Sequence, residues 1–323
     1  MKLVEKILHK LNGLHYKQEY LCLSKETFEH PLHAYLVVNN RVVKDITELH
    51  LFVGYNPLIL AIPSSGISNR GLQIIDIAFS QTLFQPNEYL AEKEAIALLS
   101  MKKIREIKVD EDTILFYEGI KGTHHFLSGF HQTIIQLNNR LHNKKQGNVF
   151  LENNLYKQVQ IAYAIPRKIC LVTVWDNNLY NHFPTDLHGR INNWYVVSLR
   201  HEGKACHQVQ SARKIVLSDI NSKAYKEVYK LGKNHMQPPK DRSFFDFNSI
   251  FSKNFNLPLA KDVLSYKELE LENSFINGIH KLLLFRVVFE EKISSEPATL
   301  AHIHNCYATW RFKHRISSNY LLR

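Results

Sequence analysis

The second half of the chain opens on short apolar runs that alternate with polar segments. Between residues 165 and 203 these runs are rich in Val, Ile, Leu and aromatic residues, which suit a pleated, half-buried strand. An Asp-Asn-Asn string at 176–178 has the composition of a turn. The pattern therefore predicts a strand, a turn, a second strand, a polar loop, a third strand and a basic loop.

The last strand of this stretch ends in side chains that can bind an anion. Ser198 and Arg200 close the strand, and Lys204 follows in the basic loop. A hydroxyl, a guanidinium and an ammonium in one short segment can make charge-assisted hydrogen bonds to a phosphate. The alternative interpretation is that Arg200 and Lys204 are ordinary solvated charges at a strand end.

Apolar runs of this kind recur along the rest of the chain and predict a mainly β fold with peripheral helices. Further strands are predicted at 33–38, 41–43, 57–63, 72–79, 104–109, 113–117, 213–220, 269–271 and 281–290. Helices are predicted at 2–12, 88–101, 130–141 and 223–231. The helix at 88–101 is predicted from its Ala and Leu content and from Asn87, which can cap it.

A polar run at 142–148 predicts a boundary between two domains, 1–147 and 148–323. The halves share a short string, Thr-Glu-Leu-His at 47–50 and Thr-Asp-Leu-His at 185–188, with strand patterns around each. One interpretation is a duplicated domain whose two copies pair as an intramolecular pseudo-dimer. The other is coincidence, because patterns with a period of two match one another easily.

Composition and charge narrow the function classes. The chain is 45% hydrophobic and 22% charged, as expected of a folded protein with a sizeable core. No apolar run is long enough to cross a bilayer, and the first residues lack the apolar core of a signal peptide, so we expect a cytoplasmic protein that does not bind membranes. The net charge of +11 favours anionic partners, but the basic residues are spread out, which argues against nucleic acid.

The sequence lacks the motifs of several enzyme classes. The four cysteines are isolated from one another, so we expect buried thiols and no metal site. The paired histidines, at 124–125 and at 302 and 304, have no further ligand at metal-binding spacing. There is no Gly-x-Ser-x-Gly elbow, no glycine-rich phosphate loop and no dinucleotide fingerprint.

Between Pro166 and Lys204 the sequence carries four short motifs: Pro166-Arg167, Leu171-Val172-Thr173, Asn181 with Pro184, and Ser198 with Arg200 before Lys204. With these motifs, the stretch from about 155 to 315 resembles the flavin-reductase-like family of FMN-binding split barrels. Members of that family open with Pro-Arg-Pro and a Leu-Val-Thr-like strand, continue through an Asn-x-x-Pro-x-Ser-like loop, and end a strand in Val-Ser-x-Arg before a Lys-Thr pair. The matching residues here are Pro166, Arg167, Leu171, Val172, Thr173, Asn181, Pro184, Ser198, Arg200 and Lys204. The resemblance implies an antiparallel split β-barrel that pairs as a homodimer or, with a diverged copy in the first half, as a pseudo-dimer of two tandem barrels.

The resemblance also implies a flavoprotein oxidoreductase that moves reducing equivalents from NAD(P)H through FMN, with FAD less expected. Ser198, Arg200 and Lys204 would hold the FMN phosphate. The loop with Asn181, Pro184, Thr185 and Asp186 would run along the flavin ring and its ribityl chain. No catalytic residue is implied, and NAD(P)H would bind transiently over the flavin.

Three positions depart from the family pattern. Ala205 stands where the family has a phosphate-binding Thr, Gln208 replaces an Asn, and Asp186 would bring a negative charge near the ring. In the first half, the counterpart of Ser198-Leu199-Arg200 is the uncharged 60–62, so one flavin site per chain is predicted. A non-catalytic module that recruits an anionic partner through a degenerate barrel stays open as an alternative, as does a relative that binds haem or pyridoxal phosphate.

Overall fold

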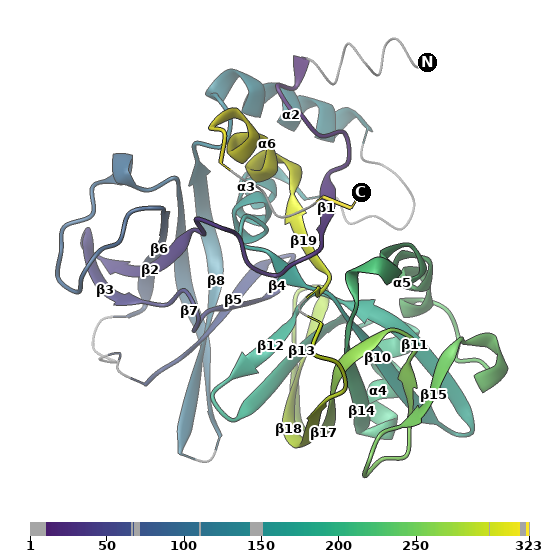
Figure 1. Cartoon of the computed structure of the whole chain (residues 1–323). Helices are drawn as coiled ribbons and strands as arrows, with labels where there is room; N and C mark the ends of the chain where they lie inside the picture. The colour runs from purple at the N-terminus through teal and green to yellow at the C-terminus, as the bar shows by residue number, and fades with distance from the viewer. Residues whose placement is uncertain are drawn as a thin grey trace.

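A computed structural model of the chain describes residues 11–65, 67, 72–109, 111–142, 151–296, 298–316 and 321–322. Two large antiparallel sheets dominate it and lie side by side, one from each half of the chain (Figure 1). The predicted mainly β fold with peripheral helices is thus confirmed. The helix predicted at 2–12 lies largely outside the described residues, as does most of the predicted boundary run 142–148. The division into 1–147 and 148–323 stays a prediction.

The first sheet has seven strands in the order β3-β2-β6-β7-β8-β5-β4. In β7, buried and less buried residues alternate from Ala97 to Met101, so one side of this part of the strand faces the core, whereas β5 is buried along its whole length. The strands are β2 (His33–Val38), β3 (Arg41–Asp45), β4 (Leu51–Tyr55), β5 (Leu58–Pro63), β6 (Ile74–Ser80), β7 (Ala97–Val109) and β8 (Asp112–His124).

The second sheet also has seven strands, in the order β11-β10-β14-β17-β18-β13-β12. The strands are β10 (Cys170–Asp176), β11 (Leu179–Thr185), β12 (His188–Ile191), β13 (Trp194–Arg200), β14 (Lys214–Ile220), β17 (Val263–Asn277) and β18 (His280–Lys292). Numbered by their position within each half, the two sheets have the same strand order, 2-1-5-6-7-4-3. The two Thr-acid-Leu-His strings occupy the same place, since each joins the second and third strands of its sheet.

A small third sheet ties the two ends of the chain together. Strand β19 (Ala301–His304) lies between β1 (Tyr20–Leu23) and β9 (Arg167–Lys168), and the pairing of β1 with β19 is visible near the centre of Figure 1. Helices α2 (Gly129–His142), α3 (Asn153–Ala162) and α6 (Asn305–Lys313) lie on the side of the first sheet, and residues of α3 and α6 share its core. Helices α4 (Lys204–Ala212) and α5 (Tyr225–Leu231) and the hairpin of β15 (Phe247–Phe251) and β16 (Pro258–Ala260) belong to the second half.

The two large sheets share a hydrophobic core where they meet. Strands β4, β5 and β8 contribute apolar residues from one side, and β12, β13, β17 and β18 contribute them from the other. Phe116 and Phe275 meet across this contact with ring centroids 5.0 Å apart and planes at 83°. The halves are therefore packed as one body through buried apolar surface, which stabilises their relative position.

Two sequence predictions fail locally. The helix predicted at 88–101 is wrong: a short 3-10 turn, η1 (Glu92–Glu94), is followed directly by β7. Ala97, Leu99 and Met101 point into the core while the chain pairs with β6 and β8, so strand pairing outweighs the helix propensity of Ala and Leu. The polar loop predicted before Trp194 contains a short strand, β12. The four cysteines are buried and free, as predicted.

Candidate functional site

Strand β13 and helix α4 bring the predicted phosphate-binding residues to one place. Ser198 and Arg200 lie at the end of β13, and α4 begins at Lys204 after a tight turn in which the Gly203 N–H donates to the Arg200 carbonyl at 3.0 Å. Ser198 is buried, Arg200 is half-buried and Lys204 is exposed. The first N–H groups of a helix have no partner within the helix, so α4 adds backbone donors to the cationic side chains.

The first half of the chain contributes to this cluster through Tyr55, at the end of β4. The Arg200 guanidinium donates from Nε and Nη2 to the Tyr55 hydroxyl, at 3.2 and 3.0 Å. The basic end of β13 therefore faces the contact between the two sheets. No local feature of the sequence signals this role of Tyr55, because it depends on how the two halves pack.

His280 is a second residue of the cluster that sequence reasoning misses. It lies directly across from Arg200 in the pairing of β13 with β18, and its Nδ1 is 3.2 Å from the Ser198 hydroxyl. Its ring packs edge-on against Tyr55 at 4.5 Å. Burial, followed by the positive charge of Arg200, lowers the pKa of His280 to about 4, so the ring is neutral at pH 7.

The Nε2 atom of His280 is buried and has no hydrogen-bond partner among the described residues. An orphaned buried polar atom costs free energy, and such atoms are uncommon in folded proteins. If Nδ1 accepts from the Ser198 hydroxyl, the neutral ring carries its proton on Nε2 and offers a donor there. A neutral N–H, a hydroxyl and a guanidinium in one cluster have the donor chemistry that fits a phosphate.

The loop predicted to follow the flavin ring is held by contacts within the second half. Asn181 is buried and donates to the Asn234 carbonyl at 3.2 Å, and the Pro184 carbonyl accepts from His235 at 2.6 Å. Asn234 and His235 belong to the short 3-10 helix η3 (Gly232–His235), and Thr185 is buried at the end of β11. The prediction of a loop is wrong for Asn181, Pro184 and Thr185, because they lie in strand β11 and pair with β10. Asp186 follows directly after that strand.

Asp186 lies in a different set of contacts from Arg200. Its Oδ2 accepts from the Tyr163 hydroxyl and pairs with His302 Nδ1, each at 3.1 Å. Burial raises the pKa of Asp186, but the hydrogen bond and charge of His302 outweigh it and bring the pKa down to about 2. The negative charge of Asp186 is therefore paired with a side chain of β19.

His302 carries the matching positive charge. Burial lowers its pKa, but the hydrogen bond with Asp186, the contact with Cys22 and the charge of Asp186 together outweigh burial and raise the pKa to about 9. Its Nε2 makes a hydrogen bond with the Tyr229 hydroxyl. The ion pair consequently links the β11–β12 connection to the C-terminal strand β19 and to α5.

The remaining polar residues of the predicted stretch have structural contacts. Both ring nitrogens of His188 are occupied, by the Tyr195 hydroxyl at 2.8 Å and the Lys168 carbonyl at 3.0 Å. Gln208 is buried and donates to the Leu179 carbonyl at 3.0 Å, and Ala205 is buried in the core of the second sheet. Both departures from the family pattern on α4 thus face the interior.

In the described part of the chain, no three His, Cys, Asp or Glu side chains gather as a metal site would require. No helix there is long and apolar enough to span a membrane.

The fold and site together define a two-sheet antiparallel β protein with a basic strand end at the sheet contact. No sequence model of a protein family matches the chain, and no curated protein matches it. Among solved structures, the NADH:FAD oxidoreductase SgcE6 of Streptomyces globisporus C-1027 is similar, with 11% identity and a TM-score of 0.41, over 50% of this chain and 95% of that chain.

Two further solved structures are similar over a comparable part of this chain. An FMN-binding protein from Thermus thermophilus has 20% identity and a TM-score of 0.36, over 40% of this chain and 74% of that chain. The styrene monooxygenase flavin reductase of Pseudomonas putida S12 has 15% identity and a TM-score of 0.35, over 42% of this chain and 87% of that chain. The three structures are of a flavin oxidoreductase, an FMN-binding protein and a flavin reductase, which is the class of protein that the second half of the sequence resembles.

Proposed function

We propose that this chain binds one FMN at the contact between its two halves and acts as a flavin-reductase-like oxidoreductase. The observation that carries the proposal is the cluster of Ser198, Arg200 and His280 with Tyr55, where cationic and neutral donors converge at the sheet contact. An orphaned donor in a buried cluster beside a guanidinium is a reason to expect an anionic ligand.

Each residue has a defined part in this proposal. Arg200 and Lys204 hold the phosphate by charge, and the first N–H groups of α4 add to that hold. His280 Nε2 donates to a phosphate oxygen and so satisfies its own buried proton. Asn181 and Pro184 join β11 to η3, and Thr185 ends that strand, so that this rigid edge would position the rest of the flavin. When bound, the flavin supplies the transfer of reducing equivalents from NAD(P)H.

Asp186 has an electrostatic part in this proposal. Its carboxylate, compensated by His302, leaves the adjoining space close to neutral instead of negative. A neutral surrounding disfavours reduced flavin less than an isolated carboxylate does. In this proposal the ion pair with His302 makes Asp186 compatible with a reduced flavin nearby.

The two halves would pair within one chain as a pseudo-dimer that arose by duplication. The equal strand orders and the shared position of the Thr-acid-Leu-His strings support this. One site per chain follows, because the first half has Leu60, Ala61 and Ile62 where the second has Ser198, Leu199 and Arg200. FMN is preferred over FAD because the donors assigned here serve a single phosphate.

The direct test is to purify the protein, record its visible absorbance and titrate it with FMN under NADH and under NADPH. Tight FMN binding together with oxidation of one nicotinamide nucleotide would support the proposal. Colourless protein that takes up no added FMN would overturn it. Identification of any small molecule released on denaturation would separate FMN from FAD, haem and pyridoxal phosphate.

A second candidate is a non-catalytic module that binds an anionic partner. It is favoured by the burial of Ser198, whose hydroxyl is already engaged by His280. In that case the basic residues would serve a macromolecular anion, and binding would weaken steeply with salt. Flavin-free protein with such a salt dependence would select this candidate.

A further inference from the structure

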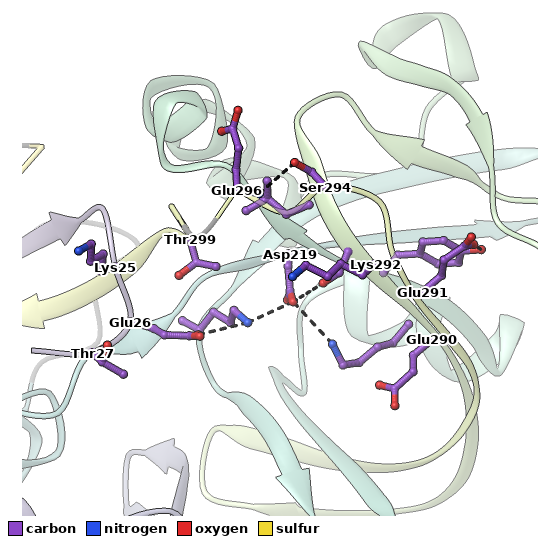
Figure 2. Close-up of a pocket in the computed structure, with 15 residues that line it drawn as sticks. Lys25, Glu26, Thr27, Asp219, Glu290, Glu291, Lys292, Ser294, Glu296 and Thr299 are labelled. Atoms are coloured by element: carbon purple, nitrogen blue, oxygen red, sulfur yellow. Dashed lines mark hydrogen bonds and ion pairs between the residues drawn. The ribbon is translucent and has the colours of Figure 1, made fainter.

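A large polar pocket lies outside the proposed flavin site, at the junction of the N-terminal segment and the second sheet. Its volume is about 710 Å³, which is within the range of small-molecule sites. Figure 2 shows that its walls come from the β1–β2 connection on one side and from β14, β17 and β18 on the other. Lys168 reaches it from β9, whose neighbouring residue Arg167 instead donates to the Phe52 carbonyl at 2.9 Å.

Asp219 lies at the base of the pocket and is saturated with donors. Its carboxylate accepts from Ser265 at 2.6 Å and from the Cys170 thiol at 3.0 Å, and it pairs with Lys168 at 3.1 Å and Lys267 at 3.7 Å. Burial raises the pKa of Asp219, but the two lysines outweigh it and hold the pKa well below its usual range. Asp219 is thus an anchor that holds two ammonium groups, not a site for a bound cation.

The other carboxylates that line the pocket also have partners. Glu26 pairs with Lys168 at 3.1 Å, and Glu290 pairs with Arg190 at 2.7 Å. Glu291 accepts from the Tyr266 hydroxyl at 2.9 Å, and Glu296 accepts from Asn221. Glu26 and Glu290 are therefore paired with cations, whereas Glu291 and Glu296 each accept one hydrogen bond from a neutral donor and keep their negative charge.

Three of the four lysines that line the pocket have few or no partners within the protein. Lys25 and Lys292 make no ion pair or hydrogen bond with any described residue. Lys267 is 3.7 Å from Asp219, and its ammonium lies 6.0 Å from the centroid of the Tyr195 ring. In the ladder of β14, β17 and β18, Asp219 lies opposite Ser265, and Ser265 lies opposite Lys292. Cross-strand neighbours share a face, so Lys292 extends from the same face as Asp219 and Lys267.

We propose that this pocket binds a small anion whose phosphate or carboxylate group contacts Lys267 and Lys292. The carboxylates of Glu291 and Glu296 keep acceptor capacity beyond the single partners described here. They would receive hydroxyl groups from the body of the ligand, so the class that fits is a phosphorylated or carboxylated polyol. The proposal does not depend on the flavin site.

The test is calorimetric titration of the full chain with ribose 5-phosphate, with gluconate and with ribose. The two anions separate a phosphate from a carboxylate ligand, and ribose tests the need for a charge. Binding of at least one anion, with much weaker binding of ribose, is expected. The proposal is overturned if neither anion binds or if ribose binds equally well.

A lysine variant locates the binding. Lys292→Gln removes an exposed side chain without a partner in the described structure, so the fold should survive, and the affinity for the anion should fall by about tenfold. Lys121→Gln, an exposed lysine on β8 remote from the pocket, is the matched control and should change nothing. Arg200→Ala should leave this binding unchanged, and unaltered affinity in Lys292→Gln would refute the assignment.

Discussion

Arg200 donates two hydrogen bonds to the hydroxyl of Tyr55, which belongs to the other half of the chain. The residue that the sequence singled out as a phosphate ligand is thus oriented by a residue 145 positions away. A guanidinium held in one position loses less freedom when it binds an anion, so Tyr55 should contribute to affinity without touching the ligand.

We expect Arg200→Ala to raise the Kd for FMN by about 10–100-fold, because a charge-assisted contact contributes about 1.5–3 kcal/mol. Tyr55→Phe should raise it by about 3–10-fold, since only the orientation of Arg200 is lost. Fluorescence titration of FMN measures both. Arg286→Ala, at an exposed and ion-paired position on β18, is the control. If all three variants bind FMN with the same affinity, Arg200 does not contact the flavin.

His280 should couple flavin binding to proton uptake. Its pKa of about 4 leaves it neutral, and a phosphate beside Nε2 would stabilise the imidazolium. We expect FMN binding at pH 6 to take up a fraction of a proton, measured as a dependence of the calorimetric heat on the ionisation enthalpy of the buffer. His280→Gln should remove the uptake due to the imidazole and leave only the proton exchange of the FMN phosphate itself, whereas His207→Gln on the exposed face of α4 should match the wild type.

The Asp186–His302 ion pair predicts a specific dependence of stability on pH. The pKa of Asp186 falls from 3.8 to about 2, so its contribution is present above pH 3.8 and lost as the pH falls through 2. The pKa of His302 rises from 6.5 to about 9, so its contribution is present below pH 6.5 and lost as the pH rises through 9. The pair stabilises the fold most between these two limits.

His302→Gln should accordingly lower the free energy of unfolding by about 3 kcal/mol at pH 6. The difference from the wild type should shrink as the pH approaches 10, where His302 is neutral in both states. Urea unfolding at the two pH values measures this. His207→Gln serves again as the control, and a deficit in His302→Gln that is independent of pH would show that packing, not charge, links these residues.

The local pattern of the sequence is enough to predict most strands but not the residues that contact Ser198 and Arg200. Strands such as β2 and β14 could be predicted because their β-branched residues alternate or form buried runs. The segment 97–101 could not, because its Ala and Leu favour a helix until β6 and β8 pair with it.

Tyr55 and His280 illustrate a different limit. Each reaches Arg200 or Ser198 only through long-range packing, and no local motif records that contact. The Thr-acid-Leu-His strings were informative because they recur at the same connection of two sheets with one strand order. Ser198 and Arg200 could be proposed from the sequence because a strand end that carries a hydroxyl and a guanidinium is a local feature.

Gly278 should be irreplaceable at the turn that presents His280. Its φ is +57°, and an added Cβ would lie 2.1 Å from the Asn56 carbonyl oxygen and 2.3 Å from Pro57 Cδ. That carbonyl also accepts from the Ile279 N–H at 3.1 Å. Gly278→Ala should therefore cost more than about 2 kcal/mol and weaken FMN binding as well. Thermal unfolding is the measurement, and Gly129→Ala, with nothing within 4 Å of its added Cβ, should be nearly neutral.

The contact between Phe116 and Phe275 tests whether the two halves unfold together. Phe116 is fully buried and Phe275 is 8% exposed, in a core shared by both sheets. Phe116→Ala should lower the free energy of unfolding by about 3–5 kcal/mol, whereas Phe130→Ala, at an exposed position on α2, should have little effect.

Because the shared core belongs to both halves, we expect the variant to keep a single transition, with tryptophan fluorescence and far-ultraviolet circular dichroism giving the same midpoint. Trp175 and Trp194 report on the second half and Trp310 on α6, which packs with the first. Two separated midpoints would mean that each sheet is stable without the other and that the contact between them is a junction of independent domains.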